Sequence, residues 1–178
     1  MIIKMSDTLN EYANIIELLN IAGEIDGRKK IQKIVYILKS LGANFVENFY
    51  FHYYGPYSDT LTIELEELKM MNIIEEEKND SGLFPKYRYK LKKEIDIQHN
   101  LDKYKDLIEK LNNQKSRFLE LVSTIIYFEH EGYPRDKIVN KIKIVKSDKN
   151  YTDEEIDSAF NLLKVIHDEY GFDVKRIK

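Results

Sequence analysis

The chain has 178 residues, a formal net charge of -3 at pH 7 and 43% hydrophobic residues, which allows one domain or two small ones with a substantial core. Because it contains no cysteine, disulfides, thiolate metal sites and a cysteine nucleophile are excluded, and a cytoplasmic location is favoured. The net negative charge argues against a protein that coats nucleic acid, because phosphate binding usually requires a basic surface. No apolar run approaches the roughly 20 residues of a membrane span, so we expect no membrane association.

Two helices are predicted at the start of the chain. Apolar residues at helical spacing predict the first over residues 8–22, where Thr8 and Glu11 have the form of a capping box. The second is predicted over residues 28–41. Its apolar positions Ile31, Ile34, Val35 and Leu38 are expected to face inward, and Lys29, Lys30 and Lys33 are expected to face outward.

An unusually aromatic segment follows, in which residues 49–59 read FYFHYYGPYSD. Aromatic side chains alternate along residues 49–54, which predicts a strand that Gly55 and Pro56 bring to an end. Ser58 or Asp59 is then suited to cap a third helix that extends to about Met71.

Two extended segments, residues 73–77 and 86–91, are separated by Asn79-Asp80-Ser81-Gly82, which is strong turn chemistry. They predict a β-hairpin. Helix, helix, strand, helix, hairpin is the element order of a winged-helix domain. We therefore predict a winged-helix-like domain over residues 1–95, with the hairpin as the wing.

Residues 96–178 carry helical signals without strand signals and are predicted to form a helical domain. Heptad-like spacing fits either one long helix or a helical hairpin over residues 97–130, and the segment 118–128 is apolar almost all round, as in a buried helix. Further helices are predicted over residues 136–145 and, after a capping box of Thr152 and Glu155, to about Tyr170. The expected fold class is mainly α with a small β-hairpin or sheet (α+β), in which a helical bundle packs on the winged-helix-like domain.

Three segments carry a family resemblance: residues 27–37 (GRKKIQKIVYI), 51–58 (FHYYGPYS) and 65–68 (LEEL). Over roughly its first half the chain resembles the bacterial YwgA-like uncharacterised proteins. More distantly, a Lys-x-x-Lys-x-x-Tyr helix followed by a Tyr-Gly-Pro turn is similar to the Panacea domain, which is associated with antitoxins of the SocA type. That resemblance implies a partner-neutralising or adaptor role rather than catalysis.

The segments that carry the resemblance also supply the candidate partner-binding residues. Exposed tyrosines around a rigid turn would anchor a protein partner, whereas the alternative is that they pin the strand to the next helix. The candidates are Lys30, Lys33, Tyr36, His52, Tyr54, Gly55, Pro56 and Tyr57.

A basic cluster on the predicted hairpin is the alternative, nucleic-acid-binding site. It would grip a phosphate backbone through the wing, or else its lysines would protect an edge strand from aggregation, which is the interpretation we favour. The third helix opposes the usual docking of such domains on DNA because it carries three glutamates against one lysine. The basic candidates are Lys86, Arg88, Lys90, Lys92 and Lys93.

No catalytic motif is visible, and the scattered histidines (His52, His99, His130 and His167) match no metal-ligand motif, so neither a metal nor a cofactor is expected. The sequence favours a non-enzymatic protein-interaction adaptor or antitoxin-like regulator with a protein partner. The alternative is a DNA-binding transcriptional regulator that uses the basic wing. A homodimer through the C-terminal helices is the expected self-association.

Overall fold

A computed structural model describes residues 7–83, 85–97 and 100–171 of the chain. The protein is mostly helical with small antiparallel sheets, which confirms the α+β class. The helices are α1 (Asp7–Asn10), α2 (Ala13–Ala22), α3 (Arg28–Ser40), α4 (Asp59–Met70), α5 (Lys105–Asn112), α6 (Ser116–His130), α7 (Arg135–Val145) and α8 (Asp153–Tyr170), with 3₁₀ turns η1 (Asp102–Tyr104) and η2 (Ser147–Lys149). The strands are β1 (Glu24–Asp26), β2 (Tyr50–His52), β3 (Gly55–Tyr57), β4 (Ile74–Asn79) and β5 (Lys86–Leu91).

The predicted first helix is divided in two. α1 ends at Asn10 and α2 begins at Ala13, and at the break the Tyr12 hydroxyl donates a 2.7 Å hydrogen bond to Oε2 of Glu67 on α4. A tertiary contact is therefore made where local periodicity indicated a continuous helix. The predicted capping box involves the Thr8 side chain, which lies outside what the structure describes.

A three-stranded antiparallel sheet has the order β1-β5-β4, and its β4–β5 hairpin confirms the predicted one. β1 was not predicted. Its buried Ile25 lies opposite Tyr89 of β5, so this short strand is specified by a partner more than 60 positions away rather than by its own pattern. The edge-strand interpretation of the basic residues is wrong, because β5 is paired on both sides.

The aromatic segment forms a second, two-stranded sheet. β2 pairs with β3 in a register that places His52 opposite Gly55, so the chain turns at Tyr53 and Tyr54. The prediction that Gly55 and Pro56 end the strand is wrong, since both belong to β3. Gly55 has a φ of +77°, and a Cβ atom there would lie 2.9 Å from Oγ1 of Thr124 on α6. Glycine thus allows the hairpin to lie directly against that helix.

The second half confirms most of its predicted helices. The chain breaks between α5 and α6, which selects the helical hairpin over one long helix. α6 is buried along most of its length because it packs against α3, α8 and the β3 strand. The capping box of Thr152 and Glu155 begins α8 as predicted.

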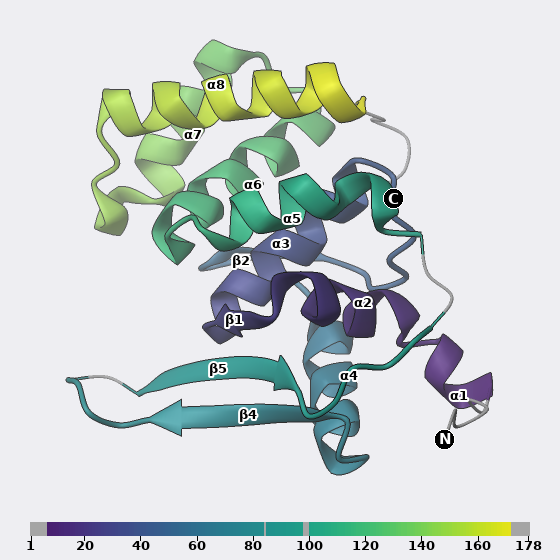
Figure 1. The fold of residues 1–178 in the computed structure, drawn as a ribbon. Coiled ribbons are helices and arrows are strands. Elements are labelled where there is room, and N and C mark those ends of the chain that lie inside the picture. The colour runs from purple at the N-terminus through teal and green to yellow at the C-terminus, as the bar shows by residue number, and fades with distance from the viewer. Residues whose placement is uncertain (1–6, 84, 98–99, 172–178) are drawn as a thin grey trace.

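Figure 1 shows α5, α6 and α8 stacked above α2 and α3, with the β4–β5 hairpin at the opposite end of the molecule from α8. α3 and α6 come from either side of residue 95, yet they pack together within one hydrophobic core cluster. The division into two domains stays a prediction. Among the described residues, no helix combines the length and the apolar character that crossing a membrane requires.

Candidate functional site

Three charged side chains from three different helices meet in the interior. Lys33 of α3, Glu120 of α6 and Lys146 at the end of α7 are 1%, 3% and 2% exposed. The Lys146 ammonium lies 2.8 Å from Oε1 of Glu120, and we call these three residues the lysine–glutamate cluster. Buried charges require such partners, because desolvation of an unpaired ion is costly.

The two lysines of this cluster hold the aromatic hairpin. Lys146 Nζ donates a hydrogen bond to the carbonyl oxygen of Tyr53, and Lys33 Nζ donates one to the carbonyl oxygen of Pro56. These carbonyls lie on either side of the turn at Tyr53 and Tyr54. The backbone of the turn is therefore fixed from below by side chains of α3 and α7.

The prediction that Lys33 faces outward is wrong. The apolar stripe of α3 is buried as expected, but the opposite side of the helix, which includes Lys33, Tyr36 and Ile37, is buried as well. The reason is that α6 covers that side. A pattern read within the first half of the chain could not anticipate a covering helix from the second half.

The electrostatics of the cluster favour an anchoring role. Burial lowers the pKa of Lys33 to about 7, an effect that the nearby Glu120 carboxylate opposes and the Lys146 ammonium reinforces. An amine with a depressed pKa can act as a nucleophile. Here, however, the Lys33 side chain is covered and its nitrogen is engaged by the Pro56 carbonyl, so its geometry supports the hairpin rather than a reaction.

Above the cluster, the turn presents two tyrosines to solvent. Tyr53 is 61% and Tyr54 is 40% exposed. Lys29 Nζ lies 3.4 Å from the ring centroid of Tyr54, Lys149 Nζ lies 5.4 Å from the same centroid, and the Tyr53 hydroxyl donates a 2.7 Å hydrogen bond to Oδ2 of Asp148. We call these five residues the tyrosine tip.

Not all the predicted partner-binding residues come together. His52, Tyr54, Gly55, Pro56 and Tyr57 share the hairpin, where the exposed His52 ring lies 5.5 Å from that of Tyr57 and the Gly-Pro pair is buried.

The two remaining candidates on α3 point elsewhere. Lys30 Nζ donates a 2.8 Å hydrogen bond to the carbonyl oxygen of Asn112 on α5. Tyr36 is fully buried against Phe49, with ring centroids 5.1 Å apart. Tyr36 therefore packs against the residue that precedes β2, and like Lys33 it presents no surface to a partner.

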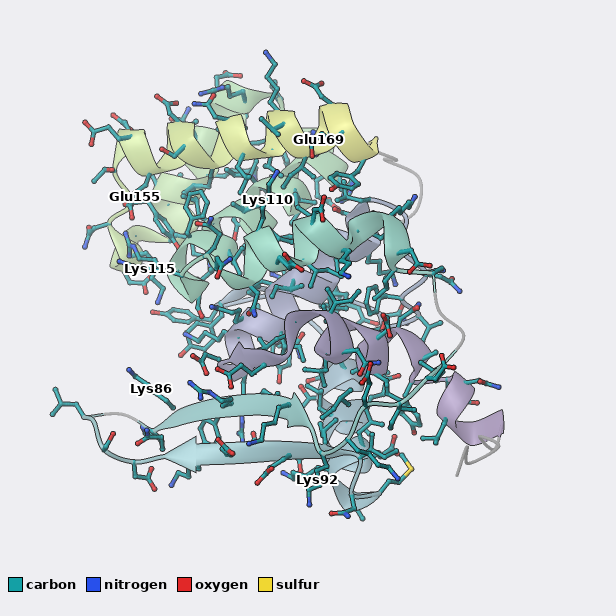
Figure 2. All side chains as sticks on the ribbon, viewed as in Figure 1. Lys86, Lys92, Lys110, Lys115, Glu155 and Glu169 are labelled. Atoms are coloured by element: carbon teal, nitrogen blue, oxygen red, sulfur yellow. The ribbon has the colours of Figure 1, made fainter. Side chains whose placement is uncertain are left out.

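Two of the five basic candidates on the β4–β5 hairpin and its exit, Arg88 and Lys90, are paired with acids. Arg88 lies 2.7 Å from Asp26 and 3.3 Å from Glu24 of β1, and Lys90 pairs with Glu77 and lies 3.7 Å from Glu75 of β4. This pairing follows from the central position of β5. Of the remaining candidates, Lys92 contacts Asn72, Lys93 is exposed just after β5, and Figure 2 shows Lys86 and Lys92 near the two ends of that strand.

The sequence contained one usable signal for the cluster. Glu120 is the lone charged residue in segment 118–128, which is apolar almost all round, and a buried acid there implies a buried cation. Nothing comparable pointed to Lys146, Asp148 or Lys149, which close the site from the far end of α7. Within the described residues, no group of three or more histidine, cysteine or acidic side chains is placed to hold a metal ion, and His99 lies outside them.

Comparison with known proteins identifies one relative of similar length. The chain is 38% identical over 161 residues to a protein of Bacillus subtilis (strain 168) named "Uncharacterized protein YwgA", covering 88% of this chain and 96% of the relative. No family model matches the chain. No solved structure matches it either.

Proposed function

The chain belongs to the family of the uncharacterised protein YwgA, and within that family we propose that it is a non-enzymatic protein-interaction module, an adaptor or antitoxin-like regulator, that contacts its partner through the tyrosine tip. The proposal places it in the cytoplasm, in keeping with a chain that lacks cysteine.

One observation carries this proposal: exposed tyrosines stand on a backbone fixed by buried ionic groups. Tyr53 and Tyr54 are exposed, while the carbonyls that flank their turn bind Lys146 and Lys33. Tyrosine supplies much contact area with few rotatable bonds, and a pre-ordered backbone reduces the entropy lost on binding. A rigid aromatic pair of this kind has the properties of a binding hot spot.

The charges around the tip indicate the chemistry of the partner. Lys29 and Lys149 flank the Tyr54 ring, and Asp148, which lies 3.2 Å from Lys149 Nζ, is the one acid among the five residues of the tip. Beneath the surface Glu120 offsets Lys146, and Lys33, whose pKa is about 7, adds part of a positive charge at neutral pH. An acidic protein surface would therefore be steered to this face.

We also propose that the first half has a winged-helix-like arrangement. It is supported by the order of α2, α3 and α4 before the β4–β5 hairpin, and by the addition of β1 to that hairpin. In this arrangement the hairpin is the wing, and α5 to α8 constitute a helical bundle.

Site-specific photo-crosslinking in cells tests the proposed surface. A photoreactive phenylalanine analogue in place of Tyr54 should give a covalent adduct with one protein, and Lys29→Glu in the same chain should weaken that adduct. The matched control carries the analogue at Val165, an exposed residue of α8. Equal adducts at both positions, or none at position 54, would contradict the proposal.

The alternative of a DNA-binding regulator has weaker support. Arg88 and Lys90 are paired with acids, which leaves Lys86, Lys92 and Lys93 as the cations of the wing without a carboxylate contact to the described residues. Fluorescence anisotropy with a generic DNA duplex at several salt concentrations separates the two functions. Tight, salt-sensitive binding that is lost when these three lysines become glutamates would favour DNA binding.

A further inference from the structure

The three-stranded sheet has an open edge along the outer side of β4. In the order β1-β5-β4, β5 is paired on both sides, whereas β4 is paired with β5 alone. Figure 1 shows that the half of the hairpin that carries the turn projects beyond the helices, with β4 as its outer strand. An open strand edge carries main-chain N–H and C=O groups that can pair with another strand.

The hydrogen-bond pattern identifies the main-chain groups on this edge. The Lys92 N–H donates a 2.9 Å hydrogen bond to the Ile73 carbonyl, in the register of the β4–β5 pair. Because bonded and non-bonded positions alternate along an antiparallel strand, the N–H and C=O groups of Glu76 and Lys78 turn away from β5. Among the described residues, these groups of Glu76 and Lys78 have no hydrogen-bond partner. They are therefore available to an added strand.

The side chains beside this edge give it an excess of negative charge. Glu75 and Glu77 are 44% and 43% exposed, and they lie on the opposite face of the sheet from the Glu76 carboxylate, which contacts Arg28 of α3. Both contact Lys90 of β5, at 3.7 Å for Glu75. Two carboxylates thus share one ammonium, and the positions nearest to an added strand keep a net negative charge.

These charges oppose pairing of β4 with a second copy of the chain. An antiparallel β4–β4 pair centred on Glu76 places Glu75 of each copy opposite Glu77 of the other, and a register shifted by two residues places Glu75 opposite Glu75 or Glu77 opposite Glu77. Like charges directly opposite each other destabilise a strand pair. The edge is therefore protected against its own copy but complementary to a strand that carries cations at these positions.

We propose that the open edge of β4 binds an extended segment of a partner protein by strand addition, and that this segment carries lysine or arginine at two positions separated by one residue. Side chains two residues apart lie on one face of a strand, so both cations meet Glu75 and Glu77, at the non-hydrogen-bonded positions where opposite side chains come closest. The residue between them exchanges main-chain hydrogen bonds with Glu76. Because this edge belongs to the β4–β5 hairpin, it is separate from the tyrosine tip.

Fluorescence anisotropy of fluorescein-labelled Val-Arg-Val-Arg-Val-amide with the full chain, at about 0.15 M salt, tests the proposal. The peptide should bind, and Glu75→Gln together with Glu77→Gln should weaken binding about three- to tenfold. Glu24→Gln is the matched control, because Glu24 is an exposed acid on the same face of the sheet but belongs to β1 at its far edge. It should change the affinity by less than about twofold.

N-methylated peptides separate strand addition from charge attraction alone. A methyl group on the main-chain nitrogen of the central valine removes the N–H that faces Glu76 and should weaken binding at least about tenfold. Methyl groups on the main-chain nitrogens of the two arginines point away from β4 and should be tolerated. When the unmethylated peptide is bound, the main-chain amides of Glu76 and Lys78 should exchange their hydrogens more slowly.

The outcomes that contradict strand addition are distinct from one another. Absence of binding, equal binding of the two methylated peptides, or an affinity that is unchanged by the paired Glu75→Gln and Glu77→Gln substitutions would overturn the proposal. So would hydrogen exchange at Glu76 and Lys78 that slows as the concentration of the peptide-free chain rises, because the edge would then pair with a second copy.

Discussion

Two buried charge clusters in this protein differ in how their charges are satisfied. In the lysine–glutamate cluster, Lys146 pairs with Glu120 and both lysines donate to backbone carbonyls of the aromatic hairpin. In a second cluster, which we call the glutamate pair, the carboxyl groups of Glu47 and Glu64 hydrogen-bond each other, and burial together with the adjacent acid raises the pKa of Glu64 to about 8.

The difference shows what a buried charge does when its partner carries the opposite charge and when its partner carries the same charge. Internal partners turn the charges of the first cluster into a fixed support for the tyrosine tip. In the second cluster two neighbouring acids repel each other when both are ionised, so Glu64 keeps its proton to a higher pH. Four predictions test this contrast, in order of decreasing expected effect.

Removal of the acid from the lysine–glutamate cluster should have the largest effect. Glu120→Gln leaves the Lys146 ammonium buried without its counter-charge, and we expect a loss of about 3–5 kcal/mol in the free energy of unfolding. Urea denaturation measures it. Asp157→Asn, which removes the surface partner of Arg135, is the control and should cost about 0–1 kcal/mol. Equal losses of unfolding free energy in the two variants would show that the buried Lys146–Glu120 pair contributes no more to stability than a surface ion pair.

The second-largest loss of stability should follow from disturbing the contact between the aromatic hairpin and α6. Gly55→Ala places a methyl group 2.9 Å from Oγ1 of Thr124 at a φ of +77°, and strain together with the close contact should cost about 1–3 kcal/mol. Gly23→Ala is the matched control, because its φ is +71° but no atom lies within 4 Å of the added carbon. The difference between the two variants in urea denaturation isolates the packing against α6, and no difference would contradict the tight contact.

Ionisation of Glu64 in the glutamate pair should make the free energy of unfolding depend on pH. Because the pKa of Glu64 is raised in the folded state, the stability it contributes is present below its unfolded value of about 4.5 and is lost as the pH rises through about 8. Glu64→Gln should remove this loss and be more stable than the wild type at pH 9, by about 1 kcal/mol after allowance for solvent access. Urea denaturation at pH 5, 7 and 9 measures the difference; parallel curves for the two proteins would refute it.

The exposed tyrosines should contribute least to stability. Tyr53→Ala with Tyr54→Ala removes side chains that are 61% and 40% exposed, so the free energy of unfolding should change by about 0.5 kcal/mol or less. Thermal unfolding followed by circular dichroism measures it. A large loss would assign the tyrosines to holding the hairpin rather than to a partner.

Elements with strong local signals could be predicted from the sequence. α3 and α4, the β4–β5 hairpin and the capping box of α8 follow from periodicity, turn residues and caps. β1 could not be predicted, because its three residues contain a single apolar side chain and become a strand by pairing with β5. Local patterns specify elements, whereas pairing between distant segments decides the rest.

The candidate site, too, could be predicted from the sequence only in part. The aromatic turn was visible in the sequence, but its support was not, because Lys33 is buried by α6 and Lys146 reaches the hairpin from the end of α7. The glutamate pair joins the segment before β2 to α4, so neither residue signals the other. Burial of a charge depends on which helix covers it, and that is a property of the whole fold.

The separation in sequence between Lys146 and Tyr53 also has a consequence during protein synthesis. Its partner carbonyl on Tyr53 lies 93 residues earlier, so a ribosome that adds roughly 5–20 residues per second needs about 5–19 s to supply the ammonium that holds the turn. For most of that interval, until His130 is added, α6 is incomplete and the Lys33 side of α3 is uncovered. A chain interrupted in this interval would carry the tyrosines without their fixed backbone, and the proposed binding surface would therefore distinguish finished molecules from unfinished ones.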